Sequence, residues 1–485
     1  MKSKTLYIFF IGIVFFSILL DTKFFEYKNL NKTEKNKSKI LNIPPLLEYN
    51  ESNKEKIYNL IIQKGETEII DGIKTETYGY NGSMLGPTIK MRKNENYRFK
   101  IYNKLGEKTS VHWHGLKVDG EMDGGPHQNF INGTYWEPNF QITQPASTLW
   151  YHPHTLYKSG EQAYKGLGGF IIIEDENSDK LDIPKEYGID DIPLVIQDKS
   201  LTRDGKLVYS NSHMTAMFGM RGNTVLVNGQ ILPEFKVQKK YIRFRLLNGS
   251  NATNYNYSFN DNREFYQIAT DGGFLEKKNK INKLFLSPGE RAEIIVEFTK
   301  EDKQNSNLRL LADDNEILKL NVQNLEKNIQ ELPEILSEIE HENIGDAKIS
   351  RKFILNDPYG PMYNINGERM DMNKINEFSK QNQTEIWEVT NSDQHHGIKN
   401  QSPSYNGTKS VNGHPFHIHS VQFLVLERNG KSPDPSEKGW KDTIFLEKNE
   451  TVKLLIKFQN KGVFMYHCHI LEHEDNGMMG QIKIE

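Results

Sequence analysis

Four pairs of histidines, each with one residue between its two members, constrain how this 485-residue chain can fold more than any other feature. The pairs are His112 and His114, His152 and His154, His417 and His419, and His467 and His469. Alternate side chains of an extended strand point to the same face, so each pair offers two imidazoles to one side. Two pairs lie in the N-terminal third and two near the C-terminus. If these segments pack together, eight imidazoles converge at their interface.

The only cysteine lies inside one of these pairs. Neutral imidazole is a good ligand for copper, and eight of them can hold three copper ions with positions left open for oxygen. Cys468 lies between His467 and His469, so in a strand its thiol points to the opposite face and serves a different metal ion. A thiolate, two imidazoles and a weak axial thioether make a blue-copper electron-transfer site. The nearby residues that complete such a set are His414, His473 and Met478.

Short apolar runs separated by Gly, Asn, Asp and Pro predict an all-β fold of sandwich or barrel domains. The clearest runs are Tyr97–Tyr102, Gly169–Ile173, Ile192–Gln197, Tyr241–Leu247, Glu293–Phe298, Phe423–Leu426, Val452–Phe458 and Gly480–Ile484. Glu326–His341 is the best helix candidate, and we expect it to connect two domains. Polar stretches at Asp175–Asp191 and Gln323–Asp346 predict domains at 53–178, 190–322 and 347–485. The second domain carries no metal motif.

The N-terminus has the layout of an export signal. Lys2 and Lys4 precede an apolar stretch, Leu6–Leu20, that is short for a transmembrane helix. No small-residue cleavage site is evident, so residues 1–25 are expected to be a signal peptide or an uncleaved membrane anchor, followed by a polar linker over 26–52. We therefore expect an exported protein, in the periplasm or at the outer face of the cytoplasmic membrane. The net charge of -3 with mixed signs gives no sign of a nucleic-acid partner, and a monomer is expected.

With these residues the chain resembles the multicopper oxidases, and among them the bacterial cuprous oxidases and laccase-like enzymes. Four motifs carry the resemblance: HWHG at 112–115, YHPHT at 151–155, HPFHIH at 414–419 and HCHILEHEDNGMM at 467–479. The likeness extends to segments without ligands, such as Asp123–Pro126 and Pro288–Arg291, and covers essentially everything after about residue 55. It implies three cupredoxin-like Greek-key domains and four copper ions.

The resemblance also assigns the ligands. The type 1 copper matches His414, Cys468, His473 and Met478. The type 2 copper matches His112 and His417, and the type 3 pair matches His114, His152, His154, His419, His467 and His469. Asp123 and Glu474 match positions of a proton relay, which the chemistry needs because each dioxygen reduced to water takes up four protons with its four electrons. The resemblance thus implies an oxidase that accepts electrons at Cys468 and delivers them to dioxygen.

The sequence leaves the electron donor open. Cu(I), in copper tolerance, is the first expectation, and phenols or other small organic donors of laccase-like enzymes are the alternative. The long Met- and His-rich insertion typical of cuprous oxidases is missing. Met362, Met370 and Met372 lie in the corresponding region and stay open as ligands of substrate copper, as do His395 and His396 close to the loop before His414. A copper-free structural relative is a remote alternative, because such relatives lose ligands and all twelve are present here.

Overall fold

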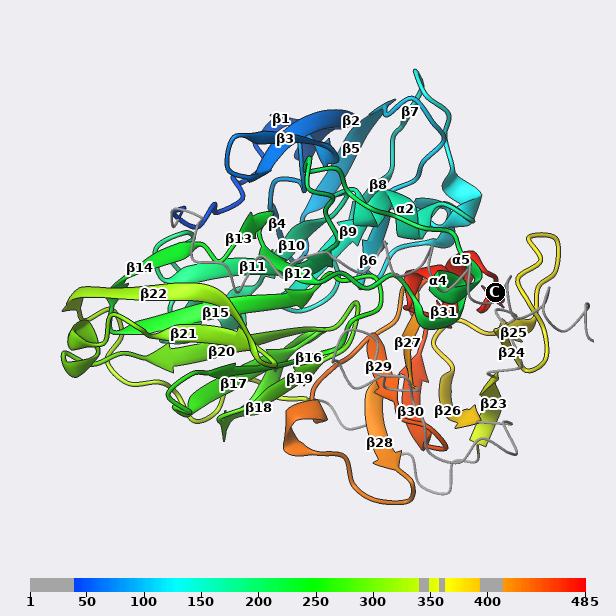
Figure 1. Cartoon of the computed structure of the whole chain (residues 1–485). Helices are drawn as coiled ribbons and strands as arrows, with labels where there is room; N and C mark the ends of the chain where they lie inside the picture. The colour runs from blue at the N-terminus through cyan, green and yellow to red at the C-terminus, as the bar shows by residue number, and fades with distance from the viewer. Residues whose placement is uncertain (1–38, 340–348, 357–362, 393–412) are drawn as a thin grey trace, which may run out of the picture.

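Six β-sheets, two for each third of the chain, form the computed structural model, which describes residues 39–339, 349–356, 363–392 and 413–485 (Figure 1). This confirms the expected all-β class. The helices between the strands are short: α2 (Ser159–Tyr164), α3 (Glu176–Lys180), α4 (His213–Phe218) and α5 (Leu471–Asp475), with 3-10 turns η2 (Gly120–Met122), η3 (Pro126–Gln128), η4 (Glu301–Gln304) and η5 (Pro435–Glu437). In the described residues no helix is both long and apolar enough to cross a membrane.

The first domain packs a sheet of order β1-β2-β5-β7, joined by β3 and β8, on a sheet of order β4-β10-β9-β6. Its strands are β1 (Tyr49–Ser52), β2 (Glu55–Ile70), β3 (Ile73–Tyr80), β4 (Ile89–Arg92), β5 (Asn96–Lys104), β6 (His112–His114), β7 (Tyr135–Trp136), β8 (Asn139–Gln141), β9 (Ser147–His152) and β10 (Gly169–Glu174). In β5 buried residues alternate with more exposed ones, as expected for a strand with one face on a core. Trp113 of β6 is fully buried in that core.

The second domain is the largest sandwich, with sheets of order β13-β12-β11-β15-β20-β17-β18 and β14-β22-β21-β16-β19. Its strands are β11 (Asp191–Lys199), β12 (Thr224–Val227), β13 (Gln230–Ile231), β14 (Glu234–Lys239), β15 (Tyr241–Asn248), β16 (Tyr255–Phe259), β17 (Phe265–Thr270), β18 (Gly273–Ile281), β19 (Leu284–Leu286), β20 (Arg291–Glu297), β21 (Arg309–Ala312) and β22 (Asn315–Glu326). Both faces of β11 and β15 are buried. The outer face of this sheet meets the other two domains, which is why ionic side chains are buried there.

The third domain packs β24-β23-β26-β30-β28 on β25-β32-β31-β27-β29. Its strands are β23 (Ile349–Asn356), β24 (Asn364–Ile365), β25 (Glu377–Ser379), β26 (Thr384–Ser392), β27 (His414–Ile418), β28 (Leu424–Arg428), β29 (Thr443–Leu446), β30 (Thr451–Lys457), β31 (Gly462–Cys468) and β32 (Met479–Ile484). Cys468 and Met478 belong to its apolar core. All eight runs that the sequence predicts as strands lie in strands, within one or two residues of the expected ends.

Two sequence-based expectations are wrong. Glu326–His341 is not a helix: Glu326 ends β22, and the described residues up to 339 follow an irregular path. Pro333 interrupts this stretch, and Ile329, Leu332 and Leu336 are buried against a core cluster although the chain is not helical. The polar linker ends earlier than residue 52: β1 pairs with β2, and Ile40 and Leu46 form bridges to Glu234 and Thr88.

Candidate metal centre

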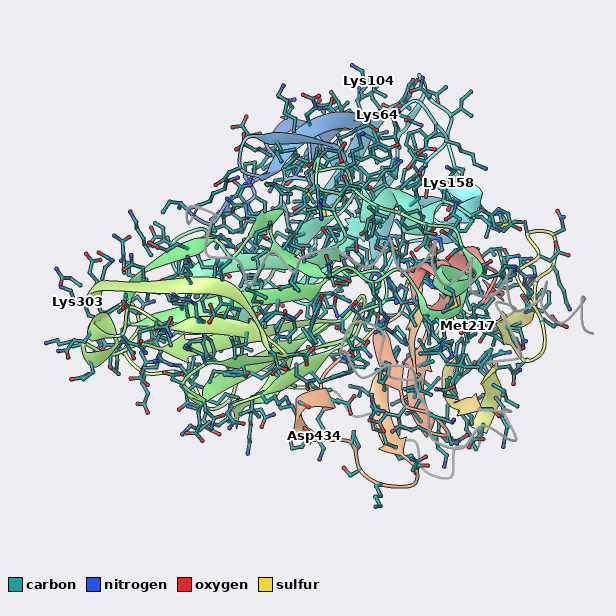
Figure 2. The ribbon with its side chains drawn as sticks, viewed as in Figure 1. Lys64, Lys104, Lys158, Met217, Lys303 and Asp434 are labelled. Carbon is teal, nitrogen blue, oxygen red and sulfur yellow. The ribbon has the colours of Figure 1, made fainter. Side chains whose placement is uncertain are left out.

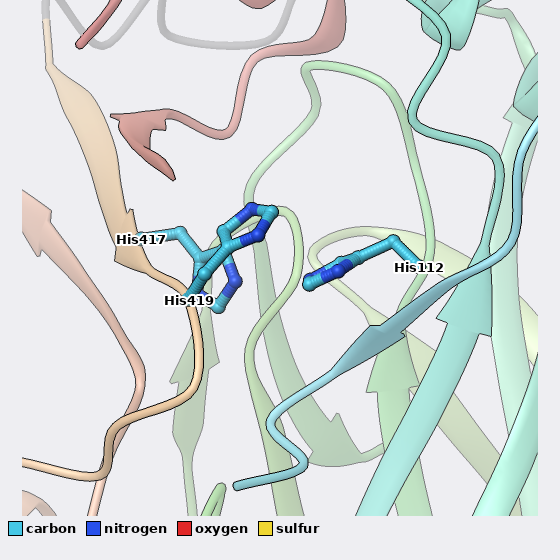
Figure 3. A group of neighbouring side chains, drawn as sticks. All are labelled: His112, His417 and His419. Atoms are coloured by element: carbon cyan, nitrogen blue, oxygen red, sulfur yellow. The ribbon is translucent and has the colours of Figure 1, made fainter. Parts of the chain in front are cut away.

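The four histidine pairs meet where the first and third domains pack together. In the first domain β6 pairs with β9 so that His112 faces His152, and in the third domain β27 pairs with β31 so that His417 faces His467. Across the interface the ring centroids of His112 and His419 are 3.8 Å apart, and Figure 3 shows His112 approaching from the opposite side to His417 and His419. All eight imidazoles are fully buried. The expected convergence of the two distant segments is therefore observed.

Hydrogen bonds fix the tautomer of the two histidines predicted for type 2 copper. His112 Nδ1 lies 3.0 Å from the carbonyl oxygen of Asp123, and His417 Nδ1 lies 2.8 Å from that of Asp442. A carbonyl only accepts, so both Nδ1 atoms carry the proton. The Nε2 atoms of both rings are buried and have no hydrogen-bond partner. Two unshared nitrogen lone pairs in a dry interface are costly unless a metal ion uses them.

A second group of nitrogens converges on one point. His467 Nε2 lies 3.0 Å from His419 Nε2 and 3.2 Å from His154 Nε2. The Nδ1 atoms face outward, to Asp123 Oδ2 at 2.7 Å for His419 and to the carbonyl oxygen of Cys468 at 3.0 Å for His467. The three inner nitrogens thus lie within the span of a single metal ion. Three neutral imidazoles, two of them with outer hydrogen bonds, form a copper-binding set.

The remaining type 3 candidates are His114, His152 and His469. His114 Nδ1 lies 3.3 Å from His152 Nε2, while His152 Nδ1 donates to the carbonyl oxygen of Pro153 at 2.9 Å. Neither nitrogen of the buried His469 has a hydrogen-bond partner. Its ring packs on Gly289, where a Cβ atom would lie 3.0 Å away and where φ is +86°. Glycine therefore leaves the space that the His469 ring occupies.

Burial keeps most of these imidazoles neutral. It lowers the pKa of the following histidines below the ordinary value: His114, His152, His154, His417, His419, His467 and His469. For His469 the pKa falls to about 3. A neutral ring is the form that binds a metal ion, so the environment suits copper rather than an imidazolium cluster.

Cys468 forms a separate group on the other side of β31. Its Sγ lies 3.4 Å from His414 Nδ1 and 3.7 Å from His473 Nδ1. The register places Phe416 opposite Cys468 and His417 opposite His467, which confirms that the thiol and the imidazoles of the pairs point to opposite faces. Met478 is fully buried beside this group, and its carbonyl accepts the Cys468 N–H at 3.1 Å. Burial raises the pKa of the Cys468 thiol, so a metal ion is needed to hold it as thiolate.

The second domain also contributes to this group, through a backbone atom that the sequence did not indicate. His473 Nε2 donates to the carbonyl oxygen of Met217 at 3.1 Å. The hydroxyl of Tyr363 donates to the same oxygen, and the Tyr363 ring stacks on His473 with centroids 3.8 Å apart. His473 is held with Nδ1 toward the thiol and is only 3% exposed.

The two predicted proton-relay carboxylates lie directly behind the histidine cluster. Asp123 Oδ2 is 2.7 Å from His419 Nδ1, and Glu474 Oε1 is 3.3 Å from His154 Nδ1. Glu474 is 1% exposed, and burial together with the nearby Asp475 raises the pKa of its carboxyl group. A buried carboxyl group with a raised pKa is suited to donate a proton to a reacting oxygen.

Helix α5, which carries Glu474, is anchored to both other domains. Asp475 accepts the backbone N–H groups of Ser159 at 3.1 Å and Gly160 at 2.9 Å. Glu472 accepts the backbone N–H of Met220 at 2.8 Å and the Asn251 amide at 2.7 Å. These bonds fix the position of α5, and with it Glu474, against the first and second domains.

A buried ionic network surrounds His114, and the sequence analysis did not find it. The guanidinium of Arg291, from the second domain, donates to both carboxylate oxygens of Asp442 at 2.7 and 2.6 Å. Asp442 Oδ1 accepts His114 Nε2 at 2.9 Å, so one carboxylate links all three domains. Arg291 stood in a segment of family likeness, but no local pattern marked Asp442.

The other histidines of the chain, and the methionines left open as ligands of substrate copper, are not members of these groups or lie outside the described residues. His127 is exposed, with its ring 2.6 Å from Gln481 Oε1, and His213 is exposed on α4. Met370 and Met372 are half-buried between β24 and β25, and the Met370 N–H donates to the carbonyl oxygen of Gly477, next to Met478, at 3.0 Å. The positions outside the described residues are His341, His395, His396 and Met362.

Family models described as multicopper oxidase match residues 61–178, 194–319 and 337–485. The multicopper oxidase mco of Staphylococcus aureus is 40% identical over 94% of this chain and 94% of its own. The cell division protein FtsP of Photorhabdus laumondii is 34% identical over 93% of this chain and 94% of its own.

Solved structures are similar over the same extent. A laccase from Pediococcus acidilactici is 36% identical with a TM-score of 0.85, over 94% of this chain and 95% of the other. A multicopper oxidase from Campylobacter jejuni, described as a metallo-oxidase, is 28% identical with a TM-score of 0.79, over 95% and 98% of the two chains. The three-domain arrangement is therefore shared with structures of this kind.

Proposed function

This chain belongs to the multicopper oxidase family of copper- and dioxygen-dependent oxidoreductases, and we propose that its electron donor is Cu(I), in a role in copper tolerance. The observation that carries this proposal is that neighbouring groups cover the ring of His473. Its ring lies under Tyr363 on one side, and its outer nitrogen is bonded to the Met217 carbonyl. A bulky aromatic donor has little of this ring to contact, whereas a single ion needs no extended pocket.

We propose the same ligand allocation that the family motifs imply. One copper ion is held by Cys468, His414, His473 and Met478, and three are held by the eight paired histidines. The donor set fits, because its buried nitrogens are neutral and several lack any other partner. When bound, these coppers supply one-electron oxidation of the donor and four-electron reduction of dioxygen to water.

The residues of the chain prepare this chemistry in three ways. Cys468 is joined by one peptide unit on each side to His467 and His469, so the two metal groups share a short covalent connection. The interface buries all eight imidazoles away from bulk solvent. Asp123 and Glu474 lie next to His419 and His154, where they are placed to pass on the protons that the reduction of dioxygen consumes.

A laccase-like oxidation of phenols or other small organic donors is the second candidate. The description of the Pediococcus acidilactici structure as a laccase supports it, as the description of the Campylobacter jejuni enzyme as a metallo-oxidase supports the first. A copper-free structural role is the third, because FtsP proteins are among the relatives. The complete set of twelve candidate ligands argues against that role.

We further propose that the protein acts outside the cytoplasm, in the periplasm or at the outer face of the cytoplasmic membrane. The basic residues and apolar stretch at the N-terminus support this location. A fusion of residues 1–38 to an export-dependent reporter tests it. Reporter protein that stays inactive in the cytoplasmic fraction would contradict it.

Oxygen consumption by the copper-loaded protein tests the donor. We expect uptake of one dioxygen for four Cu(I) ions, at a rate above that with a bulky phenol or dye. The Cys468→Ser variant is the control for copper-catalysed autoxidation. Faster turnover of the phenol, without added copper, would refute the proposal and favour the laccase-like function.

A further inference from the structure

Helix α4 of the second domain presents one imidazole and two thioethers on a single face. His213 and Met217 are four residues apart and Met214 and Met217 are three apart, which are the spacings of neighbours on a helix surface. His213 is exposed and Met214 is 54% exposed, while Met217 is half-buried toward the third domain. The intervening Thr215 is buried, so the opposite face of the helix packs on the protein.

Both ends of α4 are fixed. Ser212 caps the N-terminus, where its Oγ accepts the Thr215 N–H at 3.2 Å. Gly219 ends the helix at φ +74°, and a Cβ atom there would lie 2.2 Å from Ala252 Cβ. The next residue, Met220, donates its N–H to Glu472 of α5 at 2.8 Å. These contacts fix the position of α4, and of the face that carries His213, relative to α5.

Met217 connects this face to the Cys468 group. Its carbonyl accepts the hydrogen bond from His473 Nε2, and its half-buried side chain lies on the face of α4 that carries His213. Figure 2 labels Met217 in the view of Figure 1, in which α4 lies beside α5. A donor bound by the Met217 thioether is thus connected to His473, a proposed type 1 ligand, through Met217 itself and the hydrogen bond from its carbonyl to His473.

We propose that His213, Met214 and Met217 bind the Cu(I) substrate on the surface of α4. Soft thioethers and an imidazole favour Cu(I), and thioethers hold Cu(II) less well, so the oxidised ion is released. Each bound Cu(I) gives up one electron to the Cys468 site and leaves as Cu(II), and four such events, with the uptake of four protons, reduce one dioxygen to two waters. This inference rests on the proposed function. In it, a helix of the second domain binds the substrate ion in place of the missing Met-rich insertion.

The binding of Ag(I), a soft ion that is not oxidised, tests the site without turnover. Calorimetric titration of the copper-loaded protein with Ag(I) is expected to show one site that the double variant Met214→Leu with Met217→Leu weakens at least about tenfold. Leucine conserves the volume of methionine, so packing is little affected. The blue absorption and the copper content check that the Cys468 site is intact in the variant.

The double variant Met370→Leu with Met372→Leu is the matched control, because these methionines lie in the third domain. We expect its Ag(I) affinity and its kcat/KM for Cu(I) to equal those of the wild type. For the α4 variant we expect kcat/KM for Cu(I) to fall about tenfold, mainly through KM. His213→Gln should give a smaller loss in the same direction.

The outcomes separate the two proposals. If the wild-type protein does not oxidise Cu(I), the proposed donor is wrong, whatever the variants do. If it oxidises Cu(I) but the α4 variant binds Ag(I) and turns over Cu(I) as the wild type does, the α4 site is wrong and the donor stands. A loss confined to the Met370 and Met372 variant would also refute the α4 site.

Discussion

Asp442 Oδ1 accepts a hydrogen bond from His114 Nε2 at 2.9 Å, across the interface between the third and first domains. This contact places the proton of the imidazole on Nε2, because an ionised carboxylate only accepts. It therefore leaves the His114 Nδ1 lone pair directed at the histidine cluster. Asp442 is held by two hydrogen bonds from Arg291, so the tautomer of one metal ligand depends on a residue of the second domain.

Asp442→Asn is expected to lower copper occupancy of the histidine cluster. An amide can donate as well as accept, and it lacks the charge that pairs with Arg291, so it no longer enforces the His114 tautomer. Loss of a carboxylate behind a ligand typically costs roughly 10- to 100-fold in metal affinity or activity. Copper analysis after dialysis should show fewer than four coppers per chain with the blue band retained. Asp204→Asn, at an exposed carboxylate, is the control, and equal copper content in both variants would contradict this prediction.

Cys468→Ser is expected to abolish the blue absorption and steady-state turnover while the histidine cluster still loads copper. The thiol points away from the paired imidazoles, so its loss leaves their nitrogens in place. A hydroxyl is a poor substitute for thiolate as a copper ligand. Absorption spectra with copper quantification check this. Oxidation of donors at the normal rate by this variant would show that electrons do not arrive through Cys468.

Much of the site was predictable because it depends on local geometry. Strand alternation alone places Cys468 and His467 on opposite faces, and the observed register agrees. The helix predicted for Glu326–His341 is not formed: Ile329, Leu332 and Leu336 are buried, but the chain follows an irregular path around Pro333. Burial against a neighbouring sheet, and not local propensity, determines that segment.

The parts that the sequence could not indicate depend on contacts between distant residues. Arg291 and Asp442 are 151 positions apart, and no periodicity relates them. The contact of His473 with Met217 involves a backbone carbonyl, which any residue at position 217 would supply. Such contacts follow from how the three domains pack, which no single segment of the sequence encodes.

Glu474→Gln is expected to slow reoxidation by dioxygen about 100-fold, the lower end of what a positioned acid contributes. Glutamine keeps the shape but cannot release a proton beside His154. Copper content and anaerobic reduction by the donor should be unchanged. Stopped-flow reoxidation at several pH values checks this, with Glu66→Gln, at an exposed carboxylate, as control. Unchanged reoxidation across acid and neutral pH would remove Glu474 from the relay.

The pH dependence of stability in the copper-free protein should report the buried His414. Burial lowers its pKa to about 4, below the value of about 6.5 in an unfolded chain. The unfolded state therefore takes up the proton first as the pH falls. The contribution of His414 to the free energy of unfolding is fully present above pH 6.5. Between pH 6.5 and 4 it is lost, at up to about 1.4 kcal/mol per pH unit.

Comparison with His414→Gln isolates this contribution, because all other buried groups are the same in the two proteins. One of them is Asp475, whose pKa is raised to about 7, so it stabilises the folded protein as the pH falls. Glutamine has no proton to gain, so the free energy of unfolding of the variant should fall less steeply over this window. Urea unfolding of both copper-free proteins at pH 6.5, 5.5 and 4.5 measures the difference. Parallel curves would mean that His414 is accessible to water in the copper-free protein, contrary to its position in the apolar core beside Cys468.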